Sequence, residues 1–148
     1  MTDDVVIQEI GPDRTAATWP VMRQLRPHLT EAGYVAMVER MRGAEGFRLA
    51  AVVQDGQIRA VAGFRRLEML YCGVILSVDD LVSDEAQRSA GHGKRLLDWL
   101  KAEARATGCG QLHLDSRLSR VDAHRFYRRE GFETLGYHFV ARLEPGTT

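Results

Sequence analysis

Two glycines between a strand pattern and a helix pattern constrain the fold of this chain more than any other feature. The apolar run before them, residues 74–82, is typical of a buried strand. Gly91 and Gly93 have no Cβ atoms, so a ligand can approach the backbone, and the first turn of the following helix offers N–H groups without internal partners. With Arg88 and Lys94 nearby, the segment predicts a phosphate-binding loop. Apolar residues then mark one helical face: Leu96, Leu97, Leu100 and Ala104.

Three kinds of phosphate-binding loop compete for this segment. A P-loop would need glycine at position 88 and Ser or Thr at position 95, and both positions are arginine. The dinucleotide fingerprint G-x-G-x-x-G has Leu96 in place of its third glycine, which disfavours a nucleotide-dependent oxidoreductase. The remaining pattern, R/Q-x-x-G-x-G/A, fits residues 88–93 in full.

A second pattern follows downstream, Ala123-x-x-Phe126-Tyr127-x-x-x-Gly131-Phe132. Together the two patterns resemble the GNAT superfamily of N-acyltransferases, in which the glycine loop holds the pyrophosphate of acyl-CoA. The specific motifs lie within residues 80–132. One departure is Arg120, which stands where members of the family often carry Asn.

The order of predicted elements extends the resemblance over nearly the whole chain. Hydrophobic periodicity and turn signals predict the order β-α-α-β-β-β-α-β-α-β, which is typical of a mixed α/β sheet with helices on both faces. The GNAT fold has the same order, so the resemblance implies a mainly antiparallel sheet. The length of 148 residues predicts a single domain over residues 1–148. The Asp55-Gly56 turn predicts a hairpin, and residues 65–73 are open between strand and loop. A capping box at 119–122 and a stop at Gly131 bound the last helix. The expected ranges are helices at 14–29 and 30–42, a helix ending at Gly108, and strands at 5–10, 47–53, 58–64, 74–82, 111–115 and 137–141.

The resemblance implies a binding site for acetyl-CoA as cosubstrate. No metal is expected, because no cluster of His and Cys has the spacing of a zinc site. The pyrophosphate would be held mostly by backbone N–H groups of Arg88, Ser89, Ala90, Gly91, His92, Gly93 and Lys94. The strand end formed by Leu81, Val82 and Ser83 would pair through its backbone with the pantetheine arm.

Tyr127 is the sharpest catalytic candidate. The matching tyrosine of the family protonates the departing thiolate and lies against the cofactor, so Tyr127 is expected to contact acetyl-CoA as well. A phenol with a pKa of about 10 is protonated at neutral pH and suits that step. The alternative is an aromatic side chain that packs with Phe126 on the apolar side of a short helix.

A carboxylate pair is the candidate for handling the amine proton. Asp79 and Asp80 lie just before the cofactor-binding strand end, and strand alternation predicts that they point to opposite faces. Asp80 is the first choice, because GNAT sequences often carry Glu at that position. A solvated carboxylate pair remains the alternative, and His113, Asp115 and His124 are weaker candidates for the base.

The family shapes its acceptor pocket with the first two helices and their link, which suggests His28, Tyr34 and Arg65 as substrate-binding residues. The predicted function is acetyl transfer from acetyl-CoA to a primary amine by direct attack. The alternative is a GNAT-like module that binds acyl-CoA without turning it over. The acceptor, a small molecule or a peptide, cannot be identified from the sequence, and a homodimer stays open.

The composition argues against some classes of binding partner. Twenty basic and twenty acidic residues balance to a net charge of zero, which argues against a nucleic-acid coat or a polybasic membrane anchor. No apolar run approaches the roughly 20 residues of a membrane span, and the N-terminus lacks a basic signal-peptide start, so a cytoplasmic protein is expected. Cys72 and Cys109 are expected to be free thiols.

Overall fold

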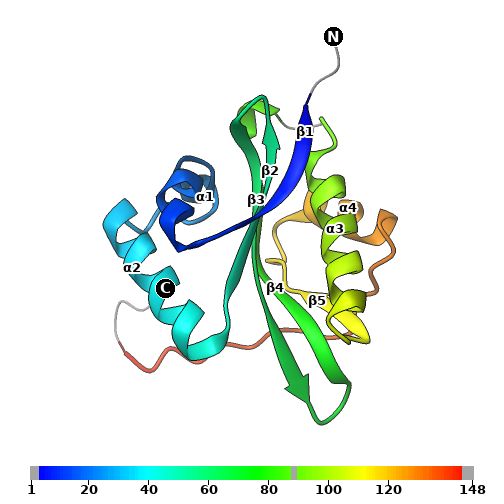
Figure 1. Ribbon diagram of the computed structural model, residues 1–148. Helices are drawn as coiled ribbons and strands as arrows, with labels where there is room; N and C mark the ends of the chain where they lie inside the picture. The colour runs from blue at the N-terminus through cyan, green and yellow to red at the C-terminus, as the bar shows by residue number, and fades with distance from the viewer. Residues whose placement is uncertain (1–3, 88–89, 145–148) are drawn as a thin grey trace. The chain divides into compact units, whose positions relative to one another are not determined.

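Five strands form one sheet in the computed structural model, which describes residues 4–87 and 90–144 (Figure 1). The strands follow the order β1-β2-β3-β4-β5 across the sheet; the first three pairings are antiparallel and β4 pairs with β5 in parallel. This confirms a mixed, mainly antiparallel α/β sheet. The strands are β1 (Val5–Ile10), β2 (Arg48–Gln54), β3 (Gln57–Met69), β4 (Gly73–Ser83) and β5 (Gln111–Leu114).

The chain divides into two compact units, residues 1–114 and 115–148, so the single domain stays a prediction. All five strands belong to the first unit. Its helical segments are η1 (Pro12–Thr18), α1 (Trp19–Leu25), α2 (Glu31–Glu45), η2 (Glu85–Gln87) and α3 (His92–Ala106). No helix among the described residues is long and apolar enough to cross a membrane.

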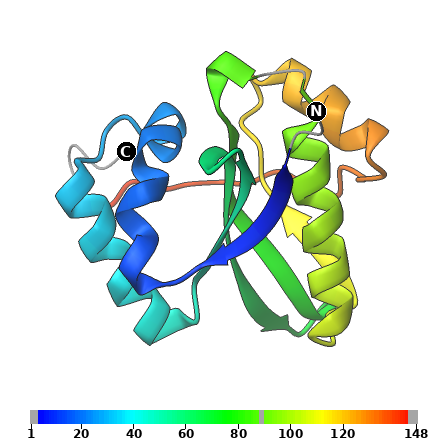
Figure 2. The same cartoon turned by 45° about the horizontal axis from the view of Figure 1, so that its top comes forward.

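Helices cover both faces of the sheet within the first unit. α1 and α2 lie on one side and α3 lies on the other, as both views show (Figures 1 and 2). On the α3 side, the rings of Phe64 and Trp99 meet edge to face at 5.9 Å. The core on the α1 and α2 side is a cluster of apolar side chains: Ile10, Val21, Met22, Tyr34, Val38, Phe47, Leu49, Ala51, Val53 and Val61.

The helix expected at 14–29 is wrong in extent. The chain first forms the 3-10 segment η1, and α1 ends at Leu25, because Arg26 precedes Pro27. The proline ring disfavours helical backbone at the residue before it, and Arg26 has φ −120° and ψ 60°.

The second helix begins as predicted. The Thr30 hydroxyl accepts a hydrogen bond from the Gly33 N–H at 3.0 Å, which caps the first turn. The helix runs three residues beyond the expected end, to Glu45, where Gly46 takes a left-handed conformation with φ 66°.

The hairpin signal at Asp55-Gly56 is confirmed. Both residues have positive φ, 52° and 77°, as a type I′ turn requires. Residues 65–69 continue β3, which settles the open interpretation of this stretch and makes β3 and β4 the longest strands.

The second unit contains α4 (Val121–Arg129). Its N-cap is Arg120, without a side-chain hydrogen bond, so the capping box at 119–122 is wrong; a tight turn from Arg117 to Arg120 precedes the helix instead. The stop at Gly131 is confirmed by its φ of 94° and by a hydrogen bond from the Phe132 N–H to the Tyr127 carbonyl.

The last predicted strand, 137–141, is not formed. Described residues 132–143 have no regular secondary structure, and Tyr137, Phe139 and Val140 are exposed. The alternating pattern satisfies the sequence rule for a strand, but a strand also needs a neighbour for its backbone hydrogen bonds. None of the described residues supplies one.

Candidate functional site

A β-bulge at Asp79 organises the candidate site. Phe64 of β3 pairs with Val78, and the preceding Gly63 pairs with Asp80, so Asp79 is an extra residue on β4. A bulge bends its strand and interrupts the alternation of side chains between the two faces. This irregularity stands where β4 carries the two predicted carboxylates.

The same point marks the separation of β4 from β5. The parallel pairing joins Ile75–Val78 to Gln111–Leu114 and ends there. From Asp80 to Ser83, β4 pairs with β3 alone among the described residues. The predicted cofactor strand, residues 81–83, therefore lies on a segment of β4 that β5 does not cover.

Asp80 is held in a part-buried ion pair. Its Oδ1 lies 2.8 Å from both Nε and Nη2 of Arg26, and its side chain is 15% exposed. Gly63 lies opposite it on β3. Burial raises the pKa of the Asp80 carboxyl, and the Arg26 charge opposes that increase.

Asp79 belongs to a second ion pair on the same side of the sheet. Its Oδ2 lies 2.9 Å from Nε of Arg65, although the two groups are not aligned as a hydrogen bond. Arg65 also lies 3.1 Å from Glu45 at the end of α2, and the Ser77 hydroxyl donates to Asp79 Oδ1 at 3.3 Å. Burial is the largest cause of a raised pKa at Asp79, and the charge of Asp80 adds to it.

The prediction that Asp79 and Asp80 point to opposite faces is therefore wrong. Asp80 pairs with Arg26 at the end of α1, and Asp79 pairs with Arg65, which reaches the end of α2. Strict alternation fails because the bulge inserts Asp79 as an unmatched residue. Two carboxylates thus share one side of the sheet.

The glycine loop forms the entry to α3. Gly91 is the N-cap with φ 81°, a left-handed conformation that glycine adopts without a Cβ penalty. Arg95 donates to the Ala90 carbonyl at 3.1 Å and lies 3.2 Å from Nδ1 of His92. The start of this 15-residue helix is thereby tied back onto the loop, with its N–H groups at the positive end of the helix dipole.

Other loop residues differ in exposure. His92 is 2% exposed, burial lowers its pKa, and its Nε2 has no hydrogen-bond partner among the described residues. Lys94 is exposed and pairs with Asp98 one turn further along at 3.2 Å. The predicted contacts of Arg88 and Ser89 lie outside the described residues.

Tyr127 lies in α4, within the second unit. Its ring packs against Phe126 at 5.5 Å and Phe132 at 5.9 Å. Burial raises the pKa of its phenol, and Arg120 partly opposes this. The shift keeps the hydroxyl protonated at neutral pH, as a general acid requires.

The three predicted acceptor residues occupy different environments. His28 is exposed in the turn between α1 and α2. Tyr34 is 4% exposed, with its hydroxyl 2.7 Å from Thr18 Oγ1, so it packs in the core. Only Arg65 directly contacts the carboxylate pair, through Asp79.

The weaker candidates for a base have local partners. Nε2 of His113 lies 2.7 Å from Gln111 Oε1, and Nε2 of His124 lies 2.8 Å from the Arg117 carbonyl. Asp115 pairs with His138 at 3.4 Å. None of these contacts involves the carboxylate pair.

Arg26 and Gly63 are not among the site residues predicted from the sequence. Arg26 carries no motif, and its contact spans 54 positions along the chain. Gly63 did carry a signal, because a glycine inside a strand often marks a bulge or a close approach.

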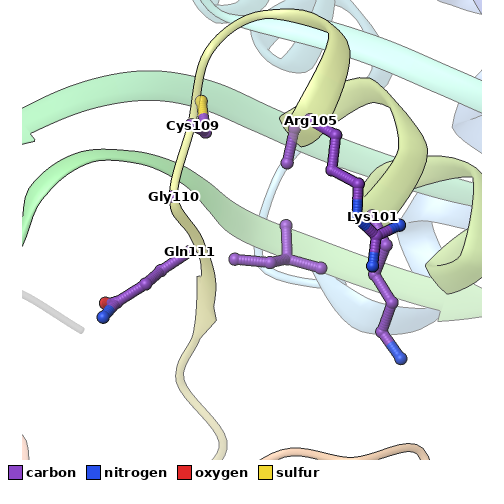
Figure 3. Close-up of a pocket in the computed structure, with 7 residues that line it drawn as sticks. Lys101, Arg105, Cys109, Gly110 and Gln111 are labelled. Atoms are coloured by element: carbon purple, nitrogen blue, oxygen red, sulfur yellow. The ribbon is translucent and has the colours of Figure 1, made fainter.

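A cavity of about 100 Å³ lies between the C-terminal half of α3 and the start of β5 (Figure 3). The buried side chain of Cys109 lines this cavity. Cys109 and Cys72 are both free thiols, as predicted. None of the predicted site residues contributes to its wall. The lining residues are Lys101, Ala104, Arg105, Cys109, Gly110, Gln111 and Leu112.

Comparison with known proteins identifies the family and the fold of this chain. Residues 15–132 match the sequence model of the acetyltransferase (GNAT) family. The uncharacterized N-acetyltransferase YhdJ of Bacillus subtilis is 37% identical over 133 residues, which cover 89% of this chain and 94% of that protein. The aminoalkylphosphonate N-acetyltransferase of Salmonella typhimurium is 30% identical over 98 residues, 66% of this chain and 62% of the relative.

Among solved structures, the aminoglycoside N-acetyltransferase AAC(6')-Iy in complex with CoA has a similar fold. The TM-score between the two structures is 0.85, their sequences are 15% identical, and the match covers 96% of each chain.

Proposed function

This chain belongs to the acetyltransferase (GNAT) family, and we propose that it transfers the acetyl group of acetyl-CoA to the primary amine of a small molecule. The observation that carries this proposal is the bulge at Asp79. It gathers two carboxylates on one side of β4, immediately before the strand segment that β5 leaves uncovered. Thioester and amine would meet at that point.

The glycine loop fits the pyrophosphate of acetyl-CoA. Among the described residues, only Arg95 Nη1 lies within 4 Å of a Cβ built on Gly91, at 3.9 Å, which leaves space for a ligand on the side that this Cβ would occupy. The loop precedes a 15-residue helix whose first N–H groups can donate to phosphate oxygens. Residues 81–83 would pair with the pantetheine arm through backbone hydrogen bonds.

The carboxylate pair supports binding and deprotonation of an ammonium group. In the ion pairs that the described residues form at the bulge, three carboxylates, Asp79, Asp80 and Glu45, face two guanidinium groups, Arg26 and Arg65. The excess of one negative charge attracts a cation. Because burial raises the pKa of Asp80 above its ordinary value, its carboxylate is a better proton acceptor than a solvated one.

The reaction then proceeds by direct attack. The amine nitrogen bonds to the carbonyl carbon of the thioester, and its proton passes to Asp80 directly or through water. A backbone N–H of β4, in the segment that does not pair with β5, stabilises the oxyanion of the tetrahedral intermediate. The C–S bond breaks, and the Tyr127 phenol protonates the departing thiolate.

The names of one sequence relative and of one protein of similar fold each include an amine acceptor, and these acceptors guide the choice of test substrates. One is named for aminoalkylphosphonates and the other for aminoglycosides, both small molecules with amino groups. The test is thiol release from acetyl-CoA with a panel of aminoalkylphosphonates, aminoglycosides, polyamines and N-terminal peptides. We expect release above the rate without acceptor for a small-molecule amine. Release with none of these, from a protein that binds acetyl-CoA, would contradict the proposal.

A further inference from the structure

Arg26 contacts both residues of the bulge. Its guanidinium lies 2.8 Å from Oδ1 of Asp80, and its Nη2 donates to the backbone carbonyl of Asp79 at 3.0 Å. One side chain thus fixes both the acidic group and the backbone that carries it. Lysine could not reproduce this planar, two-sided contact.

The local sequence explains why Arg26 can reach the bulge. Pro27 stops α1, and Arg26 takes a non-helical conformation while its N–H still donates to the Met22 carbonyl at 2.9 Å. Arg26 therefore donates the last backbone hydrogen bond of α1 and is held against the end of the helix, although its own backbone is not helical. α1 also contacts β4, the strand that carries the bulge, which supports the placement.

Building on the proposed acetyl transfer, we infer that Arg26 is a positioning residue for Asp80. It holds the carboxylate at the bulge, keeps it ionised in a part-buried setting, and fixes the backbone of Asp79. Arg26 touches neither acetyl-CoA nor the amine in this role. It acts through Asp80 and through the shape of the strand.

The charge balance at Asp80 makes the inference testable by pH. The groups that face Asp80 are Arg26 directly after α1, Arg65 from β3, its neighbour Asp79 on β4, and the Tyr34 phenol from α2. Arg26 is the only one that bonds directly to the Asp80 carboxylate. Removal of its charge should raise the pKa of Asp80 further, since burial is then opposed only by Arg65.

Arg42 provides a matched control. Its guanidinium also joins a backbone carbonyl and a carboxylate, through bonds to Ile10 O at 2.9 Å and Glu39 Oε1 at 3.3 Å. It contacts neither residue of the bulge. Substitutions at Arg42 therefore remove a comparable structural contact and leave Asp80 in place.

The kinetic experiment compares Arg26→Gln and Arg26→Lys with Arg42→Gln and Arg42→Lys. We expect Arg26→Gln to move the acid limb of kcat/KM to higher pH. Arg26→Lys should keep that limb near the wild-type pH and lower kcat by roughly 10²-fold, the loss that a misplaced catalytic group can cause. Both Arg42 variants should keep the wild-type pH profile. An Arg26→Gln profile that superimposes on the wild type would overturn the inference.

Hydrogen exchange gives a readout that does not depend on turnover. Backbone amides of residues 78–83 should exchange faster in both Arg26 variants and at the wild-type rate in both Arg42 variants. Unchanged exchange in Arg26→Lys would also overturn the inference. A wild-type protein without acetyl transfer would contradict the proposed function alone, because exchange would still report on the Arg26 contact.

Discussion

Gly63 and Asp80 oppose each other across β3 and β4, and the missing side chain of Gly63 leaves room for the Asp80 carboxylate. A Cβ at position 63 would lie 2.7 Å from Oδ2 of Asp80 and 2.4 Å from Cζ of Phe47. Both distances are shorter than a van der Waals contact. The glycine is therefore required by close approach, and it links the bulge to the core beneath α2.

Gly63→Ala should destabilise the protein and disturb the site together. We expect the free energy of unfolding to fall by about 1–3 kcal/mol, as for overpacked cores, and kcat/KM to fall as Asp80 is displaced. Denaturant unfolding and steady-state kinetics measure the two effects. Gly43→Ala is the control, because nothing lies within 4 Å of a Cβ there and the glycine is inside α2. That variant should be as stable as the wild type or slightly more so.

Asp80→Asn should separate two roles of the carboxylate. Loss of a base lowers kcat most at neutral pH, with partial recovery at higher pH as the free amine deprotonates. Loss of ammonium attraction raises KM and largely preserves kcat. Since burial raises the pKa of Asp80, the acid limb of the wild-type profile should lie above the ordinary aspartate range and disappear in this variant.

Asp79→Asn should raise KM as well, since both carboxylates lie on one side of the sheet. Asp55→Asn in the hairpin turn is the control, because asparagine also tolerates positive φ there. Wild-type kinetics in both Asp79→Asn and Asp80→Asn would show that the pair is structural.

Tyr127→Phe removes a proton donor and keeps the ring that packs against Phe126 and Phe132. We expect kcat to fall by roughly 10²- to 10⁴-fold, the range for one general acid, with little change in acetyl-CoA affinity. Tyr137→Phe, at an exposed tyrosine of the same unit, should leave kcat unchanged. An unimpaired Tyr127→Phe enzyme would make Tyr127 a packing residue and solvent the acid.

Local signals predicted much of the fold. The Asp55-Gly56 turn, the Thr30 cap and the Gly131 stop each act within a few residues, so the sequence alone indicates them. The strand expected at 137–141 shows the limit of such signals, because a strand also depends on a partner elsewhere in the chain.

The candidate site was only partly predictable for the same reason. The glycine loop and the two aspartates are visible as motifs, but the bulge depends on the pairing of β3 with β4. The contact between Arg26 and Asp80 joins positions 54 residues apart, and no local sequence pattern predicts it. As a result, the sequence analysis placed Asp79 and Asp80 on opposite faces, whereas the bulge brings them to one side of the sheet.

The most direct test of the account is a calorimetric titration of acetyl-CoA into the folded wild-type protein, beside Gly91→Glu. We expect saturable one-site binding to the wild type. Gly91→Glu should bind no acetyl-CoA, because it places a negative charge against the pyrophosphate and a side chain at a backbone with φ 81°. Circular dichroism establishes that the variant is folded. No heat of binding from a folded wild-type protein would contradict the account.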